Sequence, residues 1–224
     1  MPRRVAIIIP TLNEETTIGQ TVASAIGTGA GEIVVSDGGS RDRTVAIARQ
    51  AGARVIEGAP MRSRQLNAAA RASQADFLIF LHGDTTLPPD AVPVVTQALE
   101  NGFVFGGFQI RFAEDERRLR VAAKMINLRT RLTGCPWGDQ AQFIARERFC
   151  QQGGFREIPI MEDYDLALRM KDAGRTVVLP QKVVTSGRRF LSKGVLATAA
   201  TNWRIIIAYR LGKDPAELER MYRR

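Results

Sequence analysis

Two stretches decide the fold of this chain: Glu32 to Thr44, EIVVSDGGSRDRT, and Phe77 to Asp84, FLIFLHGD. Each begins as an apolar run rich in β-branched or aromatic residues, which predicts a buried strand, and each run stops at an acidic residue, Asp37 or Asp84. Ligands of open α/β sheets bind in the crevice beyond the carboxyl ends of parallel strands. Two carboxylates at that edge therefore indicate a nucleotide and a metal rather than packing.

Outward from these stretches, strands and helices alternate along the chain. The expected strands are Val5–Ile9, Ile33–Ser36, Arg54–Glu57, Phe77–Leu81, Phe103–Phe112 and Gln142–Ala145. The expected helices include segments ending at Gln50 and Ala72, a long basic helix, and a helix opening near Glu162. This series predicts a parallel, doubly wound sheet with right-handed crossovers, to which Phe103–Phe112 adds an edge or antiparallel strand.

Length and composition fit one α/β domain, alone or with a C-terminal extension. The 224 residues are 45% hydrophobic and show no linker, repeat or low-complexity stretch. Cys135 and Cys150 match no metal-ligand pattern, so reduced thiols in a cytoplasmic protein are expected. The short apolar run before Pro10 is too brief for a signal peptide, and we expect the mature chain to begin here.

A net charge of +9 raises the hypothesis of nucleic-acid binding, but the distribution of charge argues against it. The basic residues gather in Arg117–Arg131, in Arg188–Lys193 and at the C-terminus, without a recognisable nucleic-acid module. A membrane surface or a phosphorylated substrate fits equally well. The Val195–Leu211 segment is too short and polar to span a bilayer; it either lies in the headgroup plane or packs on the domain with a solvated basic face.

The first strand-to-helix turn excludes several nucleotide-binding classes. A dinucleotide-binding protein places a glycine-rich loop there, whereas this turn reads Pro10-Thr11-Leu12-Asn13-Glu14-Glu15. Two carboxylates in the first helical turn repel a phosphate, and no glycine-lysine-serine/threonine run forms a P-loop. A sugar-phosphate nucleotidyltransferase is disfavoured for the same reason.

An ordered set of motifs resembles the family-2 inverting glycosyltransferases of the GT-A fold. It consists of the turn at Ile8–Glu15, the Ser36–Thr44 segment, the strand end at Asp84, Gly153-Gly154-Phe155, and Glu162-Asp163-Tyr164-Asp165-Leu166. The resemblance covers about residues 4 to 180 and implies an α/β GT-A (Rossmann-like) domain over residues 1–190, a mostly parallel sheet flanked by helices. Residues 191–224 are expected to form a C-terminal helical extension, as a membrane-surface or dimer contact.

A narrower resemblance rests on Arg62–Ala69 (RSRQLNAA) and His82-Gly83-Asp84-Thr85. These stretches are similar to a small bacterial subgroup labelled arsenosugar-biosynthesis or radical-SAM-selenodomain-associated glycosyltransferases. The label is a genomic guess about substrate.

The resemblance implies a nucleotide-sugar site at the strand ends. Its expected contacts are Pro10, Thr11, Glu14, Asp37, Gly38, Arg62, Arg64, His82, Gly83, Asp84, Arg188 and Arg189. Asp37 would accept a hydrogen bond from a pyrimidine N–H, or shape the glycine turn that follows it, or both. Arg62 and Arg64 are candidates to clamp a diphosphate, with a solvated helix start as the alternative. Arg188 and Arg189 are candidates for a lid over the diphosphate.

A divalent metal, Mn²⁺ or Mg²⁺, is expected at Asp84, where it would neutralise the charge on the leaving diphosphate. The family usually presents two acids separated by one residue, whereas this chain has His82-Gly83-Asp84. His82 is therefore either a metal ligand or a neutral hydrogen-bonding residue, and we favour the second role.

Catalysis and acceptor binding are expected in the second half of the chain. By resemblance Asp163, beside Glu162 at a helix start, is the general base that removes the proton of the acceptor hydroxyl. A carboxylate at a helix N-terminus tends to stay ionised, although acids in first turns often have no catalytic task. Trp137, Asp139 and Gln140 lie where the acceptor loop is expected, with a merely packed indole as the competing interpretation.

These residues together predict an inverting glycosyltransferase that moves a sugar from a nucleoside-diphosphate donor, a UDP-sugar favoured, to a hydroxyl acceptor. The alternatives are a sugar-nucleotide-binding regulator without turnover and a nucleotidyltransferase of similar fold. We expect no nucleic-acid partner and a cytoplasmic location. A lipid-linked acceptor would put the protein on the inner face of the membrane; with a soluble acceptor, the basic helices would instead form a homodimer interface.

Overall fold

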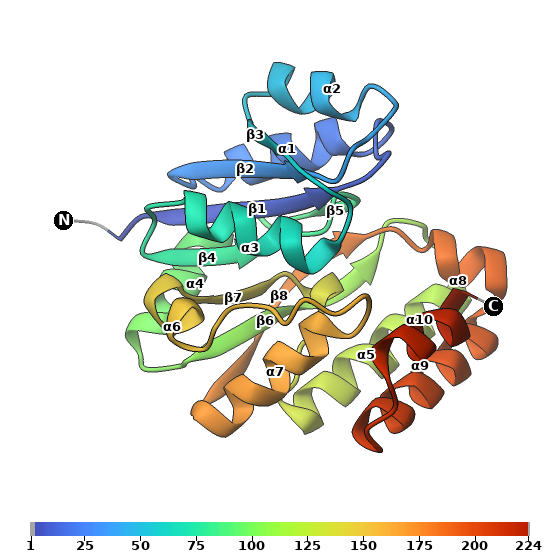
Figure 1. Cartoon of the computed structure of the whole chain (residues 1–224). Helices are drawn as coiled ribbons and strands as arrows, with labels where there is room; N and C mark the ends of the chain where they lie inside the picture. The colour runs from blue at the N-terminus through green and yellow to red at the C-terminus, as the bar shows by residue number, and fades with distance from the viewer. Residues whose placement is uncertain (1–2, 224) are drawn as a thin grey trace.

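The computed structural model describes residues 3–223, in which eight strands form one sheet (Figure 1). The strand order is β3-β2-β1-β4-β7-β6-β8-β5. The strands are β1 (Val5–Thr11), β2 (Glu32–Asp37), β3 (Arg54–Glu57), β4 (Phe77–Phe80), β5 (Thr85–Thr86), β6 (Phe105–Phe112), β7 (Gln142–Ala145) and β8 (Thr176–Thr185). The α-helices are α1 (Ile18–Gly27), α2 (Thr44–Gln50), α3 (Arg62–Ala72), α4 (Ala91–Glu100), α5 (Arg117–Thr133), α6 (Arg146–Gln151), α7 (Glu162–Ala173), α8 (Arg188–Lys193), α9 (Val195–Arg210) and α10 (Pro215–Arg223).

The N-terminal half is the parallel series that the sequence predicts. Strand β1 pairs in parallel with both β2 and β4, and β2 pairs in parallel with β3. The register places Thr11 of β1 opposite Asp37 of β2. The carboxyl ends of these strands therefore meet at one edge of the sheet, as expected for a ligand-binding crevice.

The second half of the sheet is mixed. Strand β7 runs antiparallel to β4, and β6 runs antiparallel to β7. The antiparallel pairing expected for Phe103–Phe112 is confirmed, but its edge position is wrong, because β8 pairs with the other side of β6 in parallel. Beyond β8, the short β5 pairs antiparallel with its last residues. This pairing brings the chain after Asp84 beside the end of β8.

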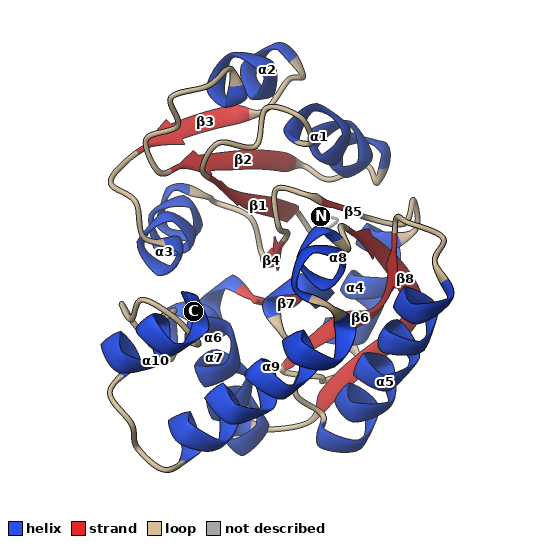
Figure 2. Cartoon of the chain, turned by 90° about the vertical axis from the view of Figure 1, so that its right-hand side faces the viewer, coloured by secondary structure: helices blue, strands red, loops and turns tan. Residues whose placement is uncertain are grey.

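Helices cover both faces of the sheet (Figure 2). One buried cluster joins the sheet to α1, α2, α4 and α5, through residues such as Ile18, Val95 and Leu119. The other joins it to α3, α6, α7 and α9, through residues such as Leu66 and Met170. Strands buried on both faces read as continuous apolar runs, which is why β1 and β4 were recognisable from sequence.

The C-terminal helices are continuous with this core. The division expected between residues 190 and 191 falls inside α8, and Phe190, Leu191 and Val195 pack against the first cluster. Ile206 of α9 belongs to the second cluster, and Leu218 of α10 is fully buried. The helices after residue 190 therefore pack on the same core as the rest of the domain.

Gly106 of β6 provides a test of this packing. A Cβ added there would lie 2.3 Å from Cζ of Phe143 and 2.7 Å from the backbone oxygen of Val177. We expect Gly106→Ala to lower the free energy of unfolding by about 1–3 kcal/mol, since overpacking forces neighbouring groups to shift. Gly27 ends helix α1 with nothing within 4 Å of such a Cβ, so Gly27→Ala should leave stability unchanged or raise it. Urea denaturation of both variants measures the difference, and equal stabilities would contradict this account.

Candidate functional site

Two neighbouring cavities lie beyond the strand ends. The turn cavity, of about 450 Å³, is lined by the first strand-to-helix turn through Pro10, Thr11 and Glu14, and by Arg62. The inner cavity, of about 230 Å³, is lined by Arg62, Asp84 and Asp163 together with the helices of the C-terminal half. Arg62 lines both cavities. The sequence-predicted donor residues and the sequence-predicted base therefore meet around one guanidinium.

Asp37 shapes the turn beside the turn cavity. It is fully buried, and its carboxylate accepts hydrogen bonds from Thr11 Oγ1 at 3.1 Å, from Gly39 N at 2.8 Å and from Ser40 N at 2.7 Å. Gly38 packs against Gln65, whose Nε2 would lie 3.0 Å from an added Cβ. The structure shows the turn role of Asp37, whereas its contact with a nucleobase stays a prediction.

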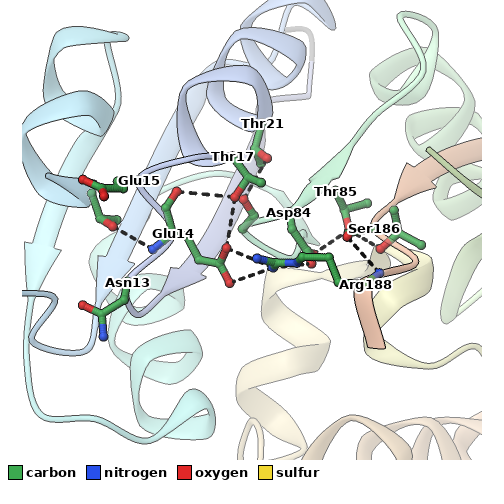
Figure 3. Close-up of polar contacts among 12 residues, drawn as sticks. Asn13, Glu14, Glu15, Thr17, Thr21, Asp84, Thr85, Ser186 and Arg188 are labelled. Carbon is green, nitrogen blue, oxygen red and sulfur yellow. Dashed lines mark hydrogen bonds and ion pairs between the residues drawn. The ribbon is translucent and has the colours of Figure 1, made fainter. Parts of the chain in front are cut away.

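Asp84 and Glu14 share one cation, the guanidinium of Arg188 (Figure 3). Its Nη2 lies 3.0 Å from Asp84 Oδ2 and 3.2 Å from Glu14 Oε2. Asp84 lines the inner cavity and Glu14 lines the turn cavity, so the pair bridges the two. Asp84 is held there by the neighbouring β5–β8 pairing, in which Thr85 Oγ1 donates to Thr185 Oγ1 at 2.9 Å.

Gly83 allows Asp84 to lie close to the first turn because it has no side chain. A Cβ on Gly83 would lie 3.3 Å from Thr11 Cγ2 and 3.4 Å from Glu14 Cγ, tighter than ordinary contact. The carbonyl of Gly83 accepts from Thr21 Oγ1 at 2.9 Å. The strand end at Asp84 is thus packed directly on the first turn of the chain.

Arg62 is the centre of a second charged cluster. Its Nε donates to Glu162 Oε1, its Nη2 lies 3.7 Å from Asp163 Oδ2, and its Nη1 lies 3.3 Å from Nε2 of His82. Glu162 is 1% exposed, so its charge depends on this partner. Asp163 Oδ2 also accepts from Gly138 N at 2.7 Å, and Oδ1 accepts from Tyr164 N at 2.8 Å.

These contacts shift the pKa values of the cluster. Burial and the charge of Arg62 lower the pKa of His82 to about 4, so the imidazole is neutral at pH 7. Burial alone would raise the pKa of Asp163, but Arg62 and the Gly138 N–H lower it below its ordinary value. Asp163 is therefore ionised. The Nε2 atom of His82 accepts from the guanidinium of Arg62, which fits the hydrogen-bonding role; the neutral form itself suits either role.

The loop at Trp137–Gln140 closes the inner cavity. Gly138 fits between His82 and Asp163, since a Cβ there would lie 2.7 Å from His82 Nε2 and 2.8 Å from Asp163 Oδ2. Trp137 and Asp139 both line the cavity, as expected for acceptor contacts. Burial raises the pKa of Asp139 to about 6 despite the positive charge of Arg129, and its Oδ1 is buried without a hydrogen-bond partner.

Two predicted site residues lie elsewhere. Gln140 is fully buried, where its Oε1 accepts from Thr130 Oγ1 at 2.8 Å and its Nε2 donates to the Phe108 carbonyl at 2.9 Å. It braces the loop and is not available to an acceptor, which corrects its assignment. Arg64 pairs with Glu157 at 2.8 Å on the surface and lines neither cavity, so the solvated alternative holds for it.

Three further residues at or beside the cavities were not predicted. Arg129 stacks on the Trp137 ring at 3.3 Å, and burial lowers its pKa to about 10. Tyr222 of α10 lines the inner cavity and stacks on Arg189 at 3.5 Å. Arg189 also lines the inner cavity and not the turn cavity, and its contact with a diphosphate stays a prediction. Glu219 of α10 lines the turn cavity. No local pattern distinguishes these residues from ordinary helix surface; Glu219 and Tyr222 reach the site only because α10 folds over the cavities.

Comparison with known proteins agrees with this arrangement. The sheet order and the acidic strand ends define a Rossmann-like α/β protein of the GT-A class. A family model, glycosyl transferase family 2, matches residues 6–156. The chain therefore belongs to glycosyl transferase family 2.

Two curated relatives illustrate the family. The chain is 30% identical over 149 residues to an undecaprenyl-phosphate 4-deoxy-4-formamido-L-arabinose transferase of Edwardsiella ictaluri, covering 60% of this chain and 46% of that protein. It is 35% identical over 125 residues to a dolichyl-phosphate hexose transferase of Haloferax volcanii, covering 54% of each. The chain thus spans about half the length of the curated relatives it matches. Within residues 3–223, no helix combines the length and apolarity needed to cross a bilayer.

Solved structures support the fold. Glucosyl-3-phosphoglycerate synthase from Mycobacterium tuberculosis, crystallised with Mn²⁺, UDP and glucosyl-3-phosphoglycerate, gives a TM-score of 0.60 at 20% identity over 82% of this chain and 71% of that chain. S. aureus TarS gives 0.68 at 15% identity over 98% and 69%. At these identities the likeness shows the GT-A fold alone.

His82 is the only histidine of the chain, so its titration can be observed directly in tag-free protein. We expect its imidazole NMR signals to titrate with a pKa of about 4. Arg62→Gln removes a nearby positive charge and should raise that pKa towards 6.5. The matched control is Arg64→Gln, on the same helix but paired at the surface. An unchanged His82 titration in Arg62→Gln, or an equal shift in the control, would contradict the cluster described here.

Proposed function

We propose that this chain is an inverting glycosyltransferase that moves a sugar from a nucleoside-diphosphate donor to a hydroxyl acceptor. The observation that carries the proposal is the junction at Arg62, where the turn cavity and the inner cavity meet between two sets of carboxylates. The turn cavity would take the nucleotide, a uridine nucleotide favoured, and the inner cavity would take the acceptor. The sugar carbon would then lie between Asp84 and Asp163.

The carboxylates of Asp84 and Glu14 suit a divalent cation. They already share one positive charge from Arg188, and Mg²⁺ is commonly held by one or two carboxylates together with substrate phosphates. Among residues 3–223 no group of three or more acidic, histidine or cysteine side chains forms such a site, and we propose that donor phosphates and water would supply the other ligands. When bound, Mn²⁺ or Mg²⁺ would supply charge neutralisation for the leaving diphosphate.

Positive side chains of the chain itself would share that task. Arg62 faces both cavities, and Arg188 lies at the carboxylate pair, so each can reach diphosphate oxygens by small side-chain movements. A guanidinium binds such oxygens bidentately. Asp37 would then act indirectly, by holding the turn against which the nucleobase lies.

Asp163 is the proposed general base. Its carboxylate is ionised and held by Gly138 N, so it can take a proton without first losing one. Glu162 acts as the positioning residue that anchors Arg62. Asp139 is a second candidate, because its pKa of about 6 and its unpartnered Oδ1 are typical of a group poised for proton transfer near neutral pH.

The acceptor is proposed to be a hydroxyl compound with an apolar part, since Phe112, Trp137, Phe190 and Ile205 line the inner cavity. The names of the relatives refer to lipid phosphates, and Arg189 in the same cavity suits a phosphate acceptor as the second candidate. A lipid-linked acceptor would place a cytoplasmic protein at the inner membrane face. The narrower arsenosugar-type subgroup, a regulator without turnover and a homodimer stay as predictions.

Donor binding is tested by calorimetric titration with UDP and then GDP, in Mn²⁺ and in EDTA. We expect tighter binding of UDP in Mn²⁺, and Asp84→Ala should abolish the difference between Mn²⁺ and EDTA. Asp90→Ala, an acid near the start of α4 that hydrogen-bonds Gln181, is the control. Equal affinity with and without metal in the wild-type protein would contradict the metal assignment; binding of neither nucleotide would contradict the donor site.

The base is tested by transfer assays on Asp163→Asn and Asp139→Asn, with Asp172→Asn on the exposed side of α7 as control. Asp163→Asn should keep UDP affinity and lower turnover by about 10²–10⁴-fold, the usual contribution of a general base. A phosphate acceptor is already ionised and needs no base. Full activity of Asp163→Asn together with full activity of Asp139→Asn would therefore contradict the hydroxyl-acceptor assignment. A loss of activity confined to Asp139→Asn would instead identify Asp139 as the general base.

A further inference from the structure

The outer face of α5 carries an apolar stripe. Val121, Met125, Leu128 and Leu132 are exposed by between 50% and 78%, at spacings of four, three and four residues. That spacing places them on one side of the helix. The opposite side is buried against the domain through Leu119 and Ala123. The stripe therefore faces outward and is not used by the fold.

Helix α9 carries a second stripe with the same spacing. Leu196, Trp203 and Ile207 are exposed by 85%, 52% and 55%, and Ala200 continues the series between them. Leu211, 81% exposed, follows the helix end. The two helices contact each other and lie on the same side of the molecule in both views (Figures 1 and 2). We call the exposed residues of the two stripes the α5–α9 face.

The charged side chains on helices α5 and α9 themselves have one sign. Residues 117–133 and 187–213 contain no Asp or Glu. Along α5, Arg117, Lys124 and Arg131 are exposed beside the apolar stripe, and Arg204 and Arg210 are exposed on α9. Two other arginines of α5 are paired with acids before the helix, Arg118 with Glu116 and Arg120 with Asp115. The remaining charges favour an anionic partner.

A second copy of the chain would suit this face poorly. A two-fold interface would bring the same basic helices together, and like charges at close range oppose association. A lipid surface instead offers an apolar layer beneath anionic headgroups, which matches apolar stripes flanked by Lys and Arg. Exposed Trp beside cations is typical of helices that lie at the headgroup level.

We infer that the α5–α9 face docks the protein on an anionic lipid bilayer, with both helices in the plane of the headgroups. The inner faces of the same helices line the inner cavity through Ile126 of α5 and through Thr198 and Ile205 of α9. The acceptor cavity thus lies about one helix diameter, roughly 10 Å, from the lipid. This position suits an acceptor presented from the membrane, the lipid-linked class under the proposed function.

Vesicle sedimentation tests the docking without any need for activity. The probes are vesicles of phosphatidylcholine alone and vesicles with roughly a third phosphatidylglycerol, the latter at low and high salt. We expect binding to the anionic vesicles, weakened by salt, and little binding to phosphatidylcholine. A blue shift of Trp203 fluorescence should accompany binding and disappear in Trp203→Phe. Leu128→Glu and Ile207→Glu should each weaken partitioning by about tenfold, because an acid replaces an inserted apolar group.

Ile26→Glu is the matched control, since Ile26 is 47% exposed on α1, away from the α5–α9 face. UDP titration of each variant reports whether the fold and donor site persist, so a failure of docking is distinguished from a failure of the proposed activity. Equal vesicle binding by Leu128→Glu and the control would overturn the inference. The inference would also be overturned if the wild-type protein did not bind anionic vesicles and light scattering showed a dimer that Leu128→Glu converts to a monomer.

Discussion

The ion pair between Arg62 and Glu162 is the interaction on which the site depends. It joins α3 of the parallel half to α7 of the mixed half, across 100 residues of sequence. Glu162 is buried, and leaving such a charge unpaired costs several kcal/mol. The ion pair therefore fixes the position of the start of α3 relative to the start of α7. The same guanidinium lowers the pKa values of His82 and Asp163 and lines both cavities. Strand pairing between β4 and β7 joins the two halves of the sheet, and Arg62 sets the geometry and the charge of the site at their junction.

The fold of the parallel half could be predicted because its signals are local. β1, β2 and β4 are short apolar runs, and most of their residues are buried. The mixed half lacks such a signal, since the place of β6 depends on which strand pairs along its free side. Strand β8 does so with a register shift between Phe108 and Gln109 that no local pattern specifies. Non-local pairing is decided by the whole sheet.

The candidate site was predictable to the level of residue type but not of role. Asp84, Asp163, Trp137 and Asp139 all reach the inner cavity. Asp37 and Gln140 belong to the same motifs, yet their polar atoms are consumed by the backbone they brace. A polar side chain near a turn either hydrogen-bonds the local backbone or remains available to a ligand, and the fold decides which of its hydrogen bonds are left unmade. That information exists only once the strands are paired.

The two cavities differ in where their walls come from. The turn cavity draws Pro10, Thr11 and Glu14 from the segment that matches the family model. Most of the apolar lining of the inner cavity lies beyond residue 156, in the segment around the start of α7 and in α8, α9 and α10. The segment that matches the family model, residues 6–156, therefore covers the turn cavity, the proposed donor side, better than the inner cavity. The C-terminal helices line the inner cavity with one face and turn another face to the exterior. Under the proposed function, they are the elements that can adapt sugar transfer to a particular acceptor and to the surface from which that acceptor is delivered.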